Sequence, residues 1–193
     1  MKHCHAMLRN SRCYSLPYHN IQHTLEVFQF ARKISDYENL SFEDKEVVSL
    51  ASLFHDTGNG EIFNGHEKIS AEKADCFLTS LGYSKEKIER VKSCIVATKM
   101  PQTPSSKLEE VICDADLAHL GSGSFINYNK RLRQEWNKCF NKSYSDIEWI
   151  ENNIMFLESH TYFTSYGKDI LQPKKMKNLE LLKSNYQELK LSL

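Results

Sequence analysis

The chain has 193 residues, which is enough for one domain with a substantial core and too few for two of ordinary size. Its 25 basic and 25 acidic side chains cancel, so no basic excess favours nucleic acid or anionic lipid as a partner. The six cysteines lack the short paired spacings of zinc ribbons, and no apolar stretch suits a signal peptide or a bilayer span. These features predict a cytoplasmic protein that does not contact the membrane and keeps its cysteines reduced.

The first helical pattern follows a stretch without clear periodicity. We expect residues 1–17 to form a flexible or irregular N-terminal segment. From about Tyr18 to Ile34, apolar residues recur at helical spacing. His19 and His23 lie four residues apart in this stretch, so we expect both imidazoles on one face of a helix.

The second predicted helix starts at Ser41, an N-cap residue, and is apolar on nearly every side, which is typical of a central buried helix. It ends at His55 and Asp56, and Gly58 then lets the chain turn. A buried carboxylate must be paired or must coordinate a metal. For a single histidine we would favour a core role, but the adjacent aspartate and the histidines elsewhere favour metal ligation.

Three more helices are predicted before residue 121. One follows the segment His66 to Ala71 and ends at Gly82, Ser84 caps the next, and Ser106 forms a capping box with Glu109 at the start of the third. This third helix carries Asp114 among apolar residues. A single aspartate of this kind is more often a surface or helix-end residue, but two such carboxylates with histidines indicate a site.

The remaining residues, 122–193, predict a helical extension packed on the core. Its last helix follows Pro173 and carries an apolar stripe that is expected to dock on the same chain; a homodimer contact is the alternative. The sequence shows no strand alternation long enough to build a sheet. The expected fold is therefore all-α, with one domain overall.

The candidate ligands are two imidazoles and two carboxylates, from His23, His55, Asp56 and Asp114. This mixed nitrogen and oxygen set suits a divalent ion such as manganese, iron, magnesium, nickel or zinc, and we expect one ion or two. A metal with open positions polarises phosphoryl oxygens and lowers the pKa of a bound water. His19 is the predicted general acid that protonates the leaving oxygen of a phosphate ester.

The order of these residues resembles that of the HD-domain superfamily of metal-dependent phosphohydrolases. The resemblance covers Tyr18 to Gly121, about half of the chain, and extends to uncharacterised bacterial proteins of that superfamily. It implies a single-domain HD-type helical bundle with a metal-binding core at residues 18–121. It also implies that Asp56 is catalytic as well as a ligand, that Asp114 is the last ligand, and that Asp116 has a supporting or structural role.

The sequence departs in two places from the motifs of related phosphodiesterases, and these differences narrow the range of expected substrates. Tyr18-His19-Asn20 followed by His23 is similar to an element of cyclic-nucleotide phosphodiesterases, where the first histidine is the general acid. Those enzymes carry a histidine three residues after the aspartate of the pair, whereas this chain has Asn59. The Gly-Tyr-Pro signature of cyclic-dinucleotide phosphodiesterases is also missing. A cyclic-nucleotide substrate therefore does not follow.

The predicted function is hydrolysis of a nucleotide or another small phosphate ester by metal-activated water. The predicted substrate contacts are His66, Lys99 and Arg131. For His66 we favour contact with a phosphate over ligation of a metal. For Lys99 and Arg131, a solvated surface position explains the charge equally well. Two alternatives stay open. They are an HD-fold di-iron oxygenase and a non-catalytic module that binds a nucleotide and regulates.

Overall fold

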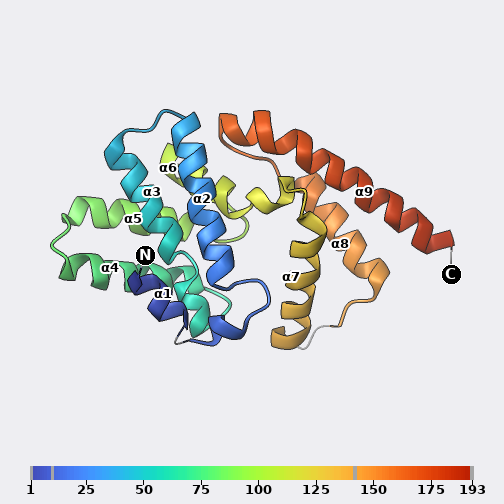
Figure 1. The fold of residues 1–193 in the computed structure, drawn as a ribbon, viewed down its shortest axis with the longest axis horizontal. Coiled ribbons are helices and arrows are strands. Elements are labelled where there is room, and N and C mark those ends of the chain that lie inside the picture. The colour runs from blue at the N-terminus through green and yellow to red at the C-terminus, as the bar shows by residue number, and fades with distance from the viewer. Residues whose placement is uncertain (1, 10, 141–142, 192–193) are drawn as a thin grey trace. The chain divides into compact units, whose positions relative to one another are not determined.

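The computed structural model describes residues 2–9, 11–140 and 143–191, and the elements in these ranges are helices, with no strand among them (Figure 1). The prediction of an all-α fold is confirmed. The helices that end at or before residue 116 are α1 (Lys2–Arg9), α2 (Ile21–Tyr37), α3 (Phe42–Phe54), α4 (His66–Ser80), α5 (Lys85–Ala97) and α6 (Lys107–Asp116). They are followed by α7 (Phe125–Phe140), α8 (Asp146–Ser159) and α9 (Gln172–Leu191). Short helical turns are η1 (Arg12–Ser15), η2 (Thr57–Gly60), η3 (Ala118–Gly121) and the π-helical η4 (Gly167–Leu171).

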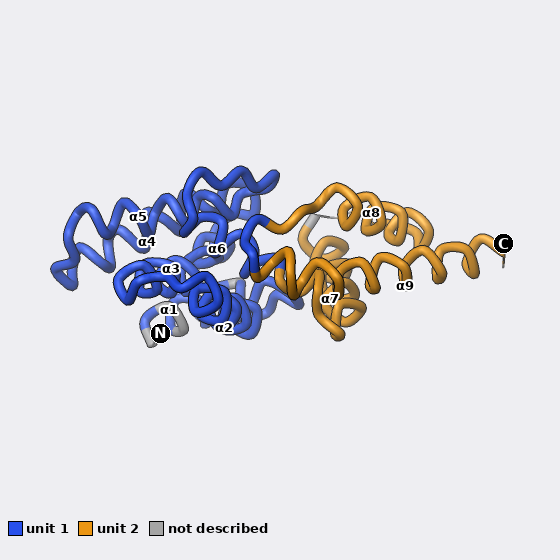
Figure 2. Tube along the Cα trace, turned by 90° about the horizontal axis from the view of Figure 1, so that it is seen from above, with its two compact units in different colours: residues 1–117, 163–165 blue, residues 118–162, 166–193 orange. Residues whose placement is uncertain are grey.

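The chain divides into two compact units, coloured separately in Figure 2. Unit 1 comprises residues 1–117 and 163–165, and unit 2 comprises residues 118–162 and 166–193. The expected N-terminal segment 1–17 is not irregular throughout, because it contains α1 and η1. Leu8 and Cys13 of this segment are buried, at 2% and 0% exposure, so apolar contacts stabilise α1 and η1. Both elements are too short to show a helical periodicity in the sequence.

Helix α3 lies at the centre of unit 1. Ser41 caps its start as predicted, accepting the Asp44 N–H at 3.1 Å. Its last four residues, 51–54, are buried, and the helix packs against α2, α5 and α6. Burial of this face stabilises the unit at roughly 25 cal/mol for each Å² of apolar surface removed from water. Whatever follows Phe54 is therefore delivered to the core.

The caps of three neighbouring helices also follow from the sequence, with one correction. Ser84 and Ser106 cap α5 and α6 as predicted. Helix α2, however, begins at Ile21, because the Asn20 side chain accepts the N–H groups of the first turn. His19 therefore precedes the helix, and the prediction that His19 and His23 lie on one face of the same helix is wrong.

The turn after α3 is held tightly against α4. The Gly58 N–H donates to Ser70 Oγ at 2.8 Å. A Cβ at position 58 would lie 2.1 Å from the backbone oxygen of His66, so a side chain at this position would require the backbone to shift. Close approach of η2 to α4 therefore explains the glycine.

In unit 2, α9 packs on α8, η3 and η4. Its apolar stripe buries Leu179 and Leu182, each at 3% exposure. Ser145 and Glu148 form a capping box at the start of α8. Gly121 lies against the Leu171 backbone, where an added Cβ would come within 2.7 Å of an oxygen.

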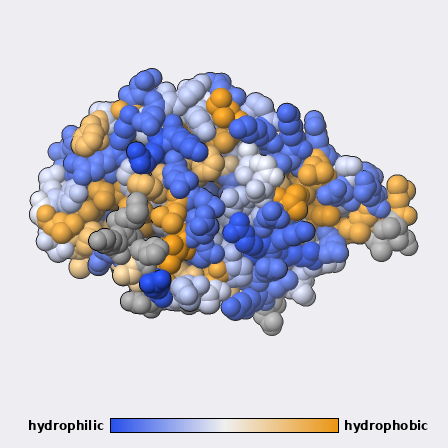
Figure 3. All heavy atoms as spheres, in the orientation of Figure 1, coloured by the Kyte–Doolittle hydropathy of each residue, from blue (hydrophilic) through white to orange (hydrophobic). Residues whose placement is uncertain are grey.

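Hydrophilic side chains predominate on the face of the molecule drawn in Figure 3, with hydrophobic ones in separate small areas. No helix among the described residues is both long enough and apolar enough to cross a bilayer.

A buried lysine contacts a histidine inside unit 2. Lys175 is 1% exposed, and its ammonium donates to the backbone oxygen of His160 and lies 3.5 Å from His160 Nδ1. The same ammonium lies 5.8 Å from the centre of the Tyr162 ring. Burial, with a smaller contribution from the Lys175 charge, lowers the pKa of His160 to about 4.

This low pKa predicts a loss of stability in mild acid. Because the unfolded chain binds the His160 proton near pH 6.5 and the folded chain only near pH 4, stability falls as pH drops through that window. Relative to His160→Gln, the wild-type free energy of unfolding should decrease by about 2 kcal/mol between pH 7.5 and pH 5. Urea unfolding of both proteins measures this, and a constant difference would contradict it.

Candidate metal centre

Three helix ends bring four polar side chains together in unit 1. His23 lies in the first turn of α2, His55 and Asp56 directly follow α3, and Asp116 is the last residue of α6. The His55 N–H still donates to the Ala51 oxygen at 2.9 Å, so the α3 geometry continues up to the histidine. Since each group is attached to a packed helix, the four are held in fixed relative positions.

The four side chains present four donor atoms to one another. The Nε2 atoms of His23 and His55 are 3.4 Å apart. Asp56 Oδ2 lies 3.4 Å from the His23 nitrogen and 3.2 Å from the His55 nitrogen. Asp116 Oδ1 lies 3.3 Å and 3.5 Å from the same two nitrogens. Donors bound to one transition ion at about 2.1 Å are roughly 3.0–3.4 Å apart. His23, His55 and Asp56, whose ligand atoms all lie within 4.8 Å of one another, therefore have the spacing of a ligand set, and Asp116 Oδ1 lies close to both imidazoles.

Two further observations fit a metal ion. His55 Nδ1 lies 2.8 Å from the Ser52 oxygen, to which it must donate, so the lone pair of the neutral ring is on Nε2. Asp56 Oδ2 is buried and accepts no hydrogen bond within the described residues. A buried carboxylate oxygen without a donor is rare, and a cation between it and the imidazoles would satisfy it.

The electrostatics of the centre are those of closely coupled charges. Burial alone would raise the pKa of Asp56, but the adjacent His55 and the hydrogen bonds around it hold that pKa well below its usual range. Burial alone would also raise the pKa of Asp116, but its contacts with His23 and His55 lower that pKa. For His55 burial would lower the pKa, and the two carboxylates raise it well above the ordinary value. Bound protons therefore compete with a metal for these donors.

The second oxygen of Asp56 has partners of its own. Asn59 Nδ2 donates to Asp56 Oδ1 at 3.1 Å, and His66 Nε2 lies 3.2 Å from the same oxygen. His66 Nδ1 in turn donates to the Phe63 oxygen at 2.7 Å. Burial lowers the pKa of His66, but the hydrogen bond and charge of Asp56 raise it more. The structure thus brings the predicted His66 to the centre, at Oδ1 of Asp56, whereas His23 and His55 lie at Oδ2.

The structure does not bring Asp114 to the cluster, which corrects the choice of last ligand. Its carboxylate is buried and accepts the N–H groups of Phe163 and Thr164, both at 2.9 Å, and the Thr164 hydroxyl at 2.6 Å. Residues two apart on a helix point about 200° away from each other, so one of positions 114 and 116 faces the histidines. That residue is Asp116, and Asp114 anchors the segment 163–165 instead.

The remaining predicted residues differ in their placement. His19 lies beside the cluster, with its ring centre 5.6 Å from that of His23. Lys99 is exposed in the turn after α5. Arg131 stands on α7 in unit 2, with its guanidinium 4.7 Å from the centre of the Tyr128 ring. Among the contacts that the structure describes in unit 1, none joins Lys99 to the cluster.

Three residues of the centre were not predicted as such. Asp116 is part of the Asp-Ala-Asp motif, but choosing it needs the rotation of α6, which the spacing alone does not give. Asn59 follows Asp56 by three residues, a spacing at which side chains in a helical turn can meet. Gln102 donates its amide to Asp116 Oδ2 at 3.4 Å from a loop, and no sequence pattern marks it.

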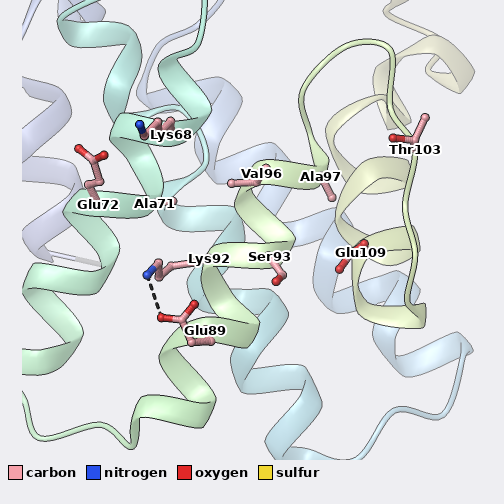
Figure 4. A pocket seen from close by; sticks show the side chains of 10 residues that line it. All are labelled: Lys68, Ala71, Glu72, Glu89, Lys92, Ser93, Val96, Ala97, Thr103 and Glu109. Atoms are coloured by element: carbon pink, nitrogen blue, oxygen red, sulfur yellow. Dashed lines mark hydrogen bonds and ion pairs between the residues drawn. The ribbon is translucent and has the colours of Figure 1, made fainter.

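A separate hollow of about 550 Å³ lies between α4, α5 and α6 (Figure 4). Three glutamates and two lysines line it, with Ala71 and Ala97 between them, and Lys92 is paired with Glu89. No member of the four-residue cluster lines this hollow. Its acidic excess does not favour phosphate, so the cluster remains the candidate centre.

Comparisons with known proteins concern the family and the fold. The family model of the HD domain matches residues 20–121. A crystal structure of a predicted HD superfamily hydrolase from an uncultured Thermotogales bacterium is similar in fold, with a TM-score of 0.65. That similarity has 18% sequence identity and covers 98% of this chain and 92% of the other. The search of curated proteins finds no match.

A pair of aspartate variants separates the ligand from the anchor. Asp116→Asn should weaken binding of Mn²⁺ or Zn²⁺ by at least about tenfold, because a cluster donor loses its charge. Asp114→Asn should leave that affinity within a factor of about three and lower the free energy of unfolding by about 2–4 kcal/mol, because donors of the segment 163–165 lose their acceptors. Calorimetric metal titration and urea unfolding measure the two effects. The opposite pattern would restore Asp114 as the ligand.

Proposed function

The chain belongs to the HD domain family, and we propose that it is a hydrolase that uses a bound divalent metal ion to cleave a phosphate ester of a nucleotide or another small metabolite. The observation that carries the proposal is the group of four donors, with His and Asp atoms 3.2–3.5 Å apart and Asp56 Oδ2 without a hydrogen-bond donor. In this proposal the ligands are His23, His55, Asp56 and Asp116.

The donor set supports a borderline or fairly hard ion, and manganese, iron, magnesium, nickel and zinc all accept two imidazoles with two carboxylates. Such an ion supplies Lewis acidity toward a phosphoryl group and makes a water molecule nucleophilic at neutral pH. We propose one ion at this cluster. The protein's own residues provide the positioning and the proton transfer.

Asp56 orients the centre through both of its oxygens. Oδ2 faces the two imidazoles, and Oδ1 is held by the Asn59 amide and lies against His66. This division fixes the rotation of the carboxylate, and so aims Oδ2 at the metal position. A catalytic role for Asp56 rests on this fixed orientation.

His19 is the proposed proton donor to the leaving oxygen. It lies next to the cluster without being one of the four donors, and its side chain is partly exposed, so a substrate can reach it. Imidazole is the side chain that most readily transfers protons near neutral pH. His19 precedes the N-cap residue Asn20, so the geometry of α2 does not fix the direction of its ring.

His66 is the proposed phosphate contact, because its Nε2 faces the centre and its pKa is raised by Asp56, which favours the cationic ring. Lys99 and Arg131 stay as proposed substrate contacts on charge alone. The substrate is small in this proposal, and the balanced net charge supports no nucleic-acid partner.

A substrate screen with a matched variant tests the function. Metal-loaded protein should hydrolyse at least one of the nucleoside mono-, di- and triphosphates, cyclic nucleotides or sugar phosphates. Asp56→Ala should lose the bound metal and at least about 100-fold of this activity. Substituting a residue that only orients a ligand typically lowers activity about 10- to 100-fold, and removing the ligand itself should cost at least as much. Asp36→Ala, at an exposed carboxylate on α2 that pairs with Lys45, is the control and should retain both.

The outcomes discriminate among the hypotheses. Unchanged metal content and activity in Asp56→Ala would contradict the proposed centre. Iron-dependent oxygen consumption without phosphate-ester hydrolysis would favour the oxygenase alternative. Nucleotide binding without turnover in metal-replete protein would favour the non-catalytic module.

A further inference from the structure

The cluster is partly exposed to solvent at two of its neighbouring side chains. The side chains of His55, Asp56 and His23 are 1%, 5% and 6% exposed, whereas those of Asp116 and His66 are 18% and 16% exposed. A molecule that reaches the centre from solvent therefore meets Asp116 or His66 first. Residues that touch these two side chains are the ones placed to meet a substrate.

Gln102 touches Asp116, the more exposed of these two side chains. Its Nε2 lies 3.4 Å from Asp116 Oδ2, while Asp116 Oδ1 faces the two imidazoles. An ionised carboxylate only accepts hydrogen bonds, so the amide must turn its NH₂ group toward Asp116. The carbonyl oxygen of Gln102 therefore points away from that carboxylate oxygen.

The carbonyl oxygen has no partner. Gln102 Oε1 is buried and accepts no hydrogen bond from any residue that the structure describes. A buried carbonyl without a donor is costly and rare, so a group that is absent from the protein itself is expected to donate to it.

The backbone around Gln102 is restricted. Pro101 and Pro104 flank it in the loop between α5 and α6, and each proline ring fixes one backbone dihedral. The amide is therefore presented by a loop with few alternative conformations. Such a residue can hold a ligand group with little loss of conformational freedom.

Asn59 offers a useful contrast. It also donates an amide N–H to a carboxylate of the cluster, at 3.1 Å to Asp56 Oδ1, but it is 1% exposed. Asn59 can position Asp56, but the whole residue is enclosed, whereas Gln102 is half-buried. Gln102 holds the more exposed carboxylate and has the unpartnered acceptor.

We propose that Gln102 positions Asp116 through its NH₂ group and binds substrate through its carbonyl oxygen, which accepts a hydrogen bond from a hydroxyl, amino or amide group of the ester. This inference rests on the proposed function and deepens it. It assigns the centre a preference for phosphate esters whose organic part carries a hydrogen-bond donor, such as a nucleoside, over esters that carry none.

The test uses Gln102→Met, which keeps the length of the side chain and removes both the donor and the acceptor. Gln22→Met is the matched control, because Gln22 donates its amide to the Glu26 carboxylate at 2.9 Å on the exposed face of α2. Kinetics are measured at saturating metal on two substrates. These are the nucleotide that the wild type hydrolyses best and p-nitrophenyl phosphate, whose leaving group carries no hydrogen-bond donor.

In Gln102→Met the ratio of kcat/KM for the nucleotide to kcat/KM for p-nitrophenyl phosphate should fall about three- to tenfold, the effect of one neutral hydrogen bond. The dissociation constant of the metal, measured by calorimetry, should rise up to about tenfold, because Asp116 loses its orienting partner. Gln22→Met should change neither quantity.

Each other outcome contradicts the inference. An unchanged kcat/KM ratio, with the wild type active, would overturn the substrate contact even if the metal affinity changed. Unchanged metal affinity would overturn the positioning of Asp116. A wild-type protein that binds no metal and hydrolyses neither ester would contradict the proposed function itself, and the role of Gln102 with it.

Discussion

The burial of the Asp56 carboxylate at the end of α3 is the constraint on which the site in unit 1 depends. An ionised carboxylate in a core is strongly unfavourable unless opposite charges and hydrogen bonds surround it. Asn59 donates a hydrogen bond to one oxygen, with His66 beside it, and the other oxygen faces the ring nitrogens of His23 and His55, where a bound cation would supply the opposite charge. The helix ends that form the cluster thus meet where the central helix would otherwise leave an unpaired charge.

The two carboxylates of the cluster share one arrangement. Each turns one oxygen toward the imidazoles and gives the other to a side-chain amide, from Asn59 for Asp56 and from Gln102 for Asp116. An amide that binds one oxygen fixes which oxygen remains for a metal. The loops that follow α3 and α5, which look like simple connections in the sequence, therefore control the geometry of the donor set.

The sequence predicted what is local and missed what depends on packing. The all-α class, the caps at Ser41, Ser84 and Ser106, and the His55–Asp56 pair follow from spacing and helix-cap chemistry. The choice between two aspartates on α6 needs the rotation of that helix, which is set by tertiary contacts. The contact of Asp114 with Thr164 joins residues 50 positions apart, and no short-range pattern encodes it.

The central claim is that one divalent ion binds among two imidazoles and two carboxylates, the second of them from Asp116. An anomalous difference map from a crystal soaked in Mn²⁺ or Zn²⁺ tests it most directly. The account predicts one peak within about 2.0–2.3 Å of His23 Nε2, His55 Nε2, Asp56 Oδ2 and Asp116 Oδ1. A peak coordinated by Asp114, or the lack of a peak among these four atoms in metal-replete protein, would contradict it.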